Sequence, residues 1–185
     1  MTNDRLENSE EVNDKNTINS SSSVNEPHFF STSNFKLVLM SICTFGIYEL
    51  FWFYKNWDLI KNRWAQKIMP FWRAFFAPIW AYSCFKEIKN AALQNNLSQT
   101  LPIVFLAVGY FIIQALWRLP DPYWLLSTFS FVFIIPANNV ALRVNESINP
   151  SFENNSYFSG TNIIAIVIGG LLFVLGLLET VMPSG

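Results

Sequence analysis

Residues 162–182 read NIIAIVIGGLLFVLGLLETVM and contain one charged side chain, Glu179, near the end of the run. A transmembrane helix needs about 20 predominantly apolar residues, so this stretch predicts a helix that crosses a membrane. The whole chain has the same character, with 51% hydrophobic and 14% charged residues. Soluble domains carry about 25% charged residues, which they need to stay dispersed in water. The sequence therefore predicts an integral membrane protein.

Four further apolar segments precede this one, at residues 35–57, 71–85, 101–117 and 123–142. The segment at 71–85 is short for a complete span, and we expect its helix to continue into the polar residues 86–96. We therefore predict an all-α fold, a multi-pass transmembrane bundle with four or five membrane-embedded helices. The number stays open because segment 71–85 either spans the membrane or dips into it.

Residues 1–31 are rich in Asn, Ser, Asp and Glu and contain no apolar run. Such a segment cannot bury enough apolar surface to offset the entropy lost on ordering. We expect two parts, a disordered polar N-terminal tail at 1–31 and a membrane helical domain at 32–185.

The segment at 35–57 has two interpretations. Thr44-Phe45-Gly46 at its centre are able to end a helix, because glycine fits the left-handed residue after a helix end. A re-entrant hairpin turning at Gly46 would follow. A single span is favoured, because isolated glycines are common inside membrane helices.

Residues 57–69 predict an amphipathic helix lying at the membrane surface. Its apolar positions share one face at helical spacing and comprise Trp57, Ile60, Trp64 and Ile68. The surrounding stretch is the most basic part of the chain, with Lys55, Lys61, Arg63, Lys67 and Arg73. The positive-inside rule places it in the cytoplasm, while the side of the N-terminus stays open.

A short motif near residue 50 resembles a known family. Thr44, Gly46, Tyr48 and Trp52 fit a Thr-x-Gly-x-Tyr-x-x-x-Trp pattern. Uncharacterised small bacterial multi-pass membrane proteins open with this pattern, and the resemblance covers residues 35–90. It implies a location in the bacterial cell inner membrane and no particular mechanism.

Glu49 and Arg73 are the candidate site residues, as an intramembrane polar pair. A carboxylate inside an apolar segment is costly and is a functional candidate by default. Arg73 opens the next apolar segment and is the nearest plausible partner for its charge. The alternative is that Glu49 is hydrated near the interface and that Arg73 extends toward lipid headgroups.

The remaining polar residues predict no catalytic, cofactor-binding or metal site. Cys43 and Cys84 suit inert buried thiols, and His28 has no partner nearby in sequence. An ordinary solvated helix end is favoured over a polar substrate site for the group Asn138, Asn139, Arg143 and Glu146. We expect no enzyme activity and no cofactor.

The expected partner is the lipid bilayer, and a net charge of -1 gives no reason to expect nucleic acid. The shared face of Ala165, Gly169 and Gly176 would let another helix approach closely, for self-association or for contact with other membrane proteins. The favoured function is therefore a non-enzymatic interaction or envelope-organising role. The alternative is a small transporter or channel subunit with Glu49 and Arg73 at a polar site, and an enzyme acting on lipid has the least support.

Overall fold

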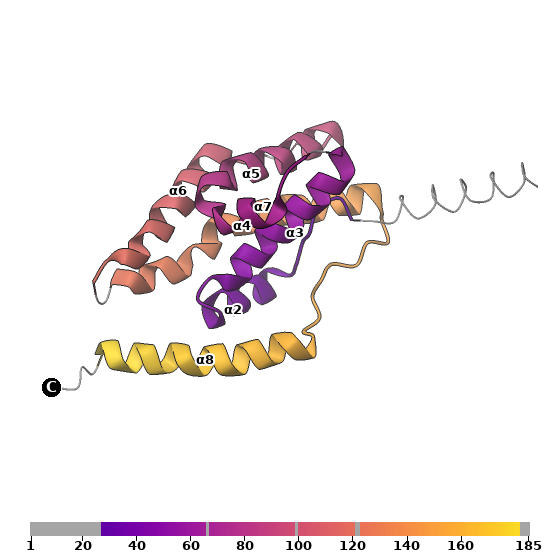
Figure 1. Cartoon of the computed structure of the whole chain (residues 1–185). Coiled ribbons are helices and arrows are strands. Elements are labelled where there is room, and N and C mark those ends of the chain that lie inside the picture. Colours follow the sequence, from indigo (N-terminus) through magenta and orange to yellow (C-terminus); the bar gives the residue numbers. More distant parts are fainter. Residues whose placement is uncertain (1–26, 66, 99, 121–122, 182–185) are drawn as a thin grey trace, which may run out of the picture.

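The computed structural model describes residues 27–65, 67–98, 100–120 and 123–181, and these fold into helices (Figure 1). The predicted all-α class is therefore confirmed. In chain order the elements are α2 (Asn34–Cys43), α3 (Ile47–Trp64), α4 (Pro70–Phe75), α5 (Ala77–Gln94), α6 (Ile103–Ala115), the 3-10 helices η1 (Leu116–Arg118) and η2 (Tyr123–Phe129), α7 (Phe131–Ile148) and α8 (Gly160–Val181).

The apolar segment at 35–57 is not a single helix, so the favoured interpretation was wrong. The chain reverses between α2 and α3, where Phe45 and Gly46 have φ of 51° and 83°. Thr44 stabilises the reversal on both sides, because its hydroxyl donates to Met40 O at 2.7 Å and accepts from Tyr48 N at 3.0 Å. Two successive left-handed residues end α2 more firmly than one glycine within a continuous helix.

The prediction of a separate surface helix at 57–69 was also wrong. Helix α3 runs without a break through Trp57 and ends at Trp64, where Ala65 has a φ of 45°. Trp57 and Ile60 are each only 1% exposed and pack against protein, whereas Trp64 is 46% exposed and Ile68 lies beyond the helix, so the four residues do not form one surface face.

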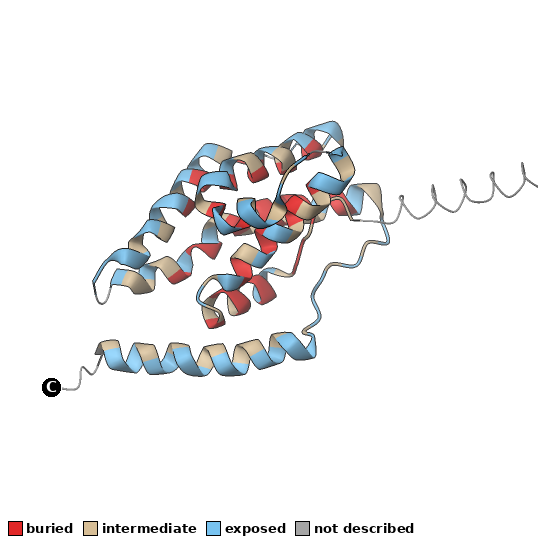
Figure 2. Ribbon diagram, viewed as in Figure 1, coloured by how far each residue is buried: buried red, intermediate tan, exposed pale blue. Residues whose placement is uncertain are grey.

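Helices α3, α5, α6 and α7 surround the core, and the most deeply buried side chains lie between them (Figure 2). Helix α5 carries Pro78 in its first turn, where a missing backbone N–H costs nothing, and then runs on to Gln94. The predicted continuation of this segment into polar sequence is therefore confirmed. Pro136 lies within α7.

Helix α8 lies along the outside of the bundle beside α2, and none of its residues 160–180 is buried (Figures 1 and 2). A Cβ atom on Gly169 would overlap the carbonyl oxygen of Cys43, and one on Gly176 would lie 3.8 Å from Trp124. Gly169 thus lets α8 approach α2 of the same chain closely, whereas Gly176 makes an ordinary contact with η2. The predicted use of this face to bind another chain stays a prediction.

Two helical stretches in the described ranges are long and apolar enough to cross a membrane. They are Tyr123–Ile148, with a mean hydropathy of 1.7, and Gly160–Thr180, with a mean hydropathy of 2.5. The stretches Asn34–Cys43 and Ile103–Arg118 are apolar but shorter. Four or five complete spans are therefore not confirmed.

Candidate functional site

Glu49 lies in the first turn of α3 and is completely buried. Ser130 Oγ lies 2.8 Å from each carboxylate oxygen, and Gln114 Nε2 donates to Oε2 at 3.2 Å. Gln114 Nε2 also lies 3.3 Å from Tyr110 Oη and 3.2 Å from Ser130 Oγ. Residues from α3, α6 and the start of α7 therefore enclose one carboxyl group with neutral polar partners.

The structure does not bring Glu49 and Arg73 together. The Arg73 guanidinium lies 4.5 Å from the ring centroid of Trp57 and 4.4 Å from that of Trp80. A planar guanidinium is attracted to the faces of aromatic rings, and two indoles satisfy it here without a carboxylate. Arg73 thus links α4 to α3 and α5 through Trp57 and Trp80, whereas Glu49 lies about two helical turns from Trp57 along α3.

The Glu49 cluster is suited to hold a proton or a charge and contains no recognisable catalytic set. Nucleophilic catalysis requires a base beside the nucleophile, whereas Ser130 faces a carboxyl group with no histidine or lysine in the cluster. Within the described ranges no group of three His, Cys, Asp or Glu residues is arranged to hold a metal ion.

We expect the mutational effects at Glu49 to be coupled to those at Ser130. Glu49→Gln removes the charge and one of the two acceptor oxygens that face Ser130 Oγ, and Ser130→Ala removes the hydroxyl group itself. The double mutant should therefore be less unstable than the sum by about 1–2 kcal/mol. The measurement is a double-mutant cycle of unfolding free energies in mixed detergent micelles.

The matched control cycle combines Glu49→Gln with Arg73→Gln. Because these side chains have separate partners, their effects should add to within about 0.5 kcal/mol. Strong coupling of Glu49 to Arg73, with none to Ser130, would contradict this arrangement.

Three buried asparagines form a second polar feature, which the sequence analysis missed. They bind the main chain of an extended segment, residues 28–32, as it runs between α3 and α7 (Figure 1). Asn145 accepts from Phe29 N at 3.0 Å and donates to Phe29 O at 2.7 Å. Asn145 Oδ1 also accepts from His28 N at 2.8 Å.

The other two asparagines repeat this arrangement. Asn56 accepts from Phe30 N at 3.1 Å and donates to Phe30 O at 3.2 Å. Asn138 accepts from Thr32 N at 3.1 Å and donates to Thr32 O at 2.7 Å. Each amide thus pairs with both main-chain groups of one residue, and we call Asn56, Asn138 and Asn145 the asparagine ladder.

The ladder moves the start of the folded part upstream. Phe29 and Ser31 are each 2% exposed, although both belong to the predicted disordered tail at 1–31. The prediction for residues 1–26 lies outside the described residues.

Asn138 and Asn145 are also buried, unlike the solvated helix end expected there, whereas Arg143 and Glu146 are exposed. The seven-residue spacing of the two asparagines, which places both on one helix face, was the signal in the sequence.

The motif that suggested a family resemblance has structural roles in this chain. Thr44 and Gly46 form the turn before α3, as described above. Trp52 is fully buried and its indole N–H donates to Asn138 Oδ1 at 3.1 Å, which joins α3 to the asparagine ladder. Tyr48 is also buried and lines a small polar cavity.

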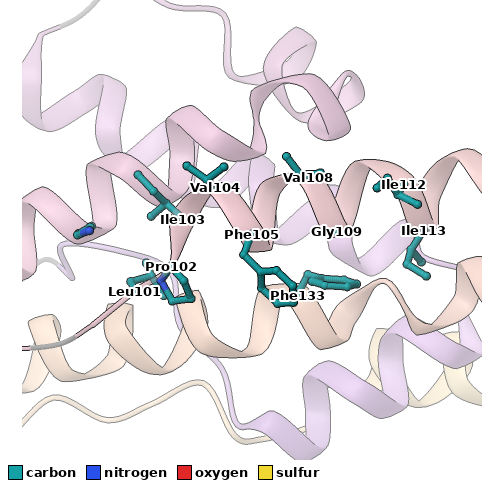
Figure 3. Close-up of a pocket in the computed structure, with 11 residues that line it drawn as sticks. Leu101, Pro102, Ile103, Val104, Phe105, Val108, Gly109, Ile112, Ile113 and Phe133 are labelled. Atoms are coloured by element: carbon teal, nitrogen blue, oxygen red, sulfur yellow. The ribbon is translucent and has the colours of Figure 1, made fainter.

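A cavity of about 790 Å³ lies against α6 and α7 (Figure 3). Phe105 and Phe133 lie side by side in its wall, with ring centroids 6.0 Å apart. The Phe133 ring covers Gly109, where a Cβ atom would overlap it. Lys89 supplies the polar side chain of the lining, so the walls offer contacts to apolar groups and little chemistry.

Comparison with known proteins finds no matching family model, no matching curated protein and no matching solved structure.

Proposed function

We propose that this chain is a multi-pass integral protein of a bacterial inner membrane and that it acts by binding other membrane components, without catalysis. An envelope-organising role is one form of such binding. The observation that carries the proposal is the surface of α8, which is apolar and has no buried residue over positions 160–180.

Helix α8 contacts the rest of the chain along one strip only. Its outward side chains are more than half exposed and apolar, among them Ile164, Val167, Ile168 and Leu171. Monomeric soluble proteins rarely expose large contiguous apolar patches, which mark contacts with a membrane or with other proteins. A bilayer supplies the apolar surroundings that this helix lacks within its own chain.

The apolar surface continues on the other helices. Exposed side chains of α4, α5 and α6 include Phe71, Phe75, Ile79, Phe105 and Ile112. The polar side chains that contact protein, by contrast, hold the fold together: the buried ladder binds residues 28–32, and the half-buried Arg73 stacks on two indoles. This division favours binding over catalysis. The motif resemblance supports the bacterial inner membrane as the location.

Self-association through Ala165, Gly169 and Gly176 belongs to the same proposal with one condition. The face is occupied by α2, so a second copy must displace α2 to use it.

A second candidate function is a small transporter or channel subunit. One observation favours it: Gln114, which donates to the buried Glu49, also lines a cavity of about 320 Å³ together with Arg118. A polar route to a buried carboxyl group is what a carrier of protons or cations requires. Arg73 has no part in this version.

Photocrosslinking tests the leading proposal. A benzophenone amino acid replaces Leu171 on the outward face of α8 and, as a matched control, Phe173, whose ring lies 5.8 Å from that of Phe45. After irradiation of cells, membranes are extracted with alkaline carbonate. We expect the chain to stay in the membrane pellet and to give a discrete protein adduct from position 171 only.

Two results would contradict the proposal separately. Release of the chain into the carbonate supernatant would remove the integral-membrane assignment. Retention in the pellet without any protein adduct from position 171 would remove the interaction role.

A further inference from the structure

A polar cavity of about 360 Å³ lies where α2 and α3 meet the first turn of α8. Lys36 comes from α2, and Tyr48 and Phe51 come from α3. The rest of the lining belongs to the connection before α8 and to its first residues, and comprises Asn155, Tyr157, Ser159, Thr161 and Asn162. The lining contains no aspartate or glutamate.

Lys36 brings a positive charge to this cavity, and within the described ranges it has no acidic partner. Its side chain is 2% exposed, and Nζ donates to Asn155 Oδ1 at 2.9 Å and to Tyr157 O at 2.6 Å. Both acceptors are neutral, and an ammonium group has three protons to donate. A buried charge without a counterion is costly, and burial accordingly lowers the pKa of Lys36.

Tyr48 adds a buried hydroxyl group, which lies beside the hydroxyl group of Thr32. The residue is 6% exposed, and its hydroxyl makes no hydrogen bond of ordinary length and angle within the described ranges. The neighbouring Thr32 hydroxyl donates instead to Asn155 O at 2.7 Å. Buried hydroxyl groups are normally paired, so an unpaired one beside a cavity indicates a partner inside the cavity.

The start of α8 contributes a third source of positive potential. The first backbone N–H groups of a helix have no acceptor within the helix, and its dipole favours an anion there. Ser159 and Thr161 bring hydroxyl groups to the same wall. The ammonium group, the phenol and the helix end therefore converge from three separate elements.

We propose that this cavity binds a phosphate group, carried by an anionic lipid headgroup or as free phosphate. Phosphate offers several acceptor oxygens and a negative charge, which match the convergent donors and the uncompensated lysine. The cavity lies at one end of the candidate span Gly160–Thr180, the depth at which lipid phosphates lie. The site goes beyond the binding role proposed above, and losing it would leave membrane insertion unchanged.

Lipid binding to the full chain, purified in a mild detergent and delipidated, tests the site. The probes are phosphatidylglycerol and a diacylglycerol with the same acyl chains but no phosphate. We expect phosphatidylglycerol to bind more tightly, and Lys36→Gln to reduce this preference by about tenfold or more, because a charged hydrogen bond is lost. Tyr48→Phe should reduce it by about threefold to tenfold.

Matched controls separate the site from general effects of charge and folding. Lys61→Gln removes the same charge from an exposed position on α3 and should leave the preference unchanged. Tyr48→Phe removes a hydroxyl group without a protein partner, so it should not lower thermal stability without lipid. This variant decides the question even if Lys36→Gln folds poorly.

Titration with inorganic phosphate identifies the source of the group. Competition with phosphatidylglycerol supports a site that recognises phosphate alone, and lipid binding without competition supports a headgroup site. Equal binding of the two lipids, with no phosphate binding, would overturn the proposal. A phosphate preference that survives both Lys36→Gln and Tyr48→Phe would also overturn it.

Discussion

Replacing Asn138 with alanine is expected to lower the free energy of unfolding by about 3–5 kcal/mol, because it removes three buried hydrogen bonds and a half-buried one at once. Thr32 N, Thr32 O and the indole N–H of Trp52 would lose this partner while remaining out of contact with water. Each unsatisfied buried group costs about 1–3 kcal/mol. The measurement is an unfolding titration in mixed detergent micelles, followed by tryptophan fluorescence.

The adjacent Asn139 provides the matched control. It is half-buried on the same helix and makes no side-chain hydrogen bond in the described structure, so Asn139→Ala should change stability by less than about 1 kcal/mol. Equal effects at the two positions would contradict the role given to the ladder.

Replacing Gly169 with alanine is expected to displace α8 from α2. The added methyl group would overlap a backbone carbonyl oxygen, that of Cys43, which cannot rotate away as a side chain would. Overpacking of this kind costs about 1–3 kcal/mol, and a helix held along a single strip has few other contacts to offset it. The measurement is disulfide crosslinking between cysteines at positions 45 and 173, whose native rings lie 5.8 Å apart, placed together in the Cys43→Ser, Cys84→Ser background.

Gly170 tests whether the effect is specific to the contact. A Cβ atom there would lie 3.6 Å from Cys43 Sγ, an ordinary van der Waals distance. Gly170→Ala should therefore be neutral or stabilising, since alanine favours a helix over glycine by about 1 kcal/mol. Loss of crosslinking in both variants would show that α8 is sensitive to any added volume.

The helices were predictable where composition and periodicity agreed. The apolar run that became α8 and the continuation of α5 to Gln94 both followed from local sequence. The turn at Gly46 was considered but not favoured, because a single glycine does not distinguish a kinked span from a reversal. The deciding interactions came from Thr44 and from the left-handed Phe45, which one sequence does not reveal.

The candidate site was less predictable because its partners are distant in sequence. Glu49 was selected from the sequence as an unusual carboxyl group, and it is buried, but its partner Ser130 lies 81 positions away and was not considered. Arg73 was predicted to pair with Glu49 because the two are near each other along the chain. In the structure its guanidinium instead lies over the indole rings of Trp57 and Trp80. Residues 28–31 were assigned to the tail because main-chain pairing with asparagine leaves no apolar pattern.

The spacing of Asn138 and Asn145 on α7 matches the length of the extended segment that they bind. Asn138 and Asn145 are seven residues apart, a rise of about 10.5 Å along a helix. Thr32 and Phe29 are three residues apart, about 10 Å along an extended chain. Because the amides contact main-chain atoms, the ladder constrains the number of residues between its contacts and places little restriction on their side chains. Substitutions within residues 28–32 are thus easier to accommodate than the insertion of one residue, which would put the two repeats out of phase.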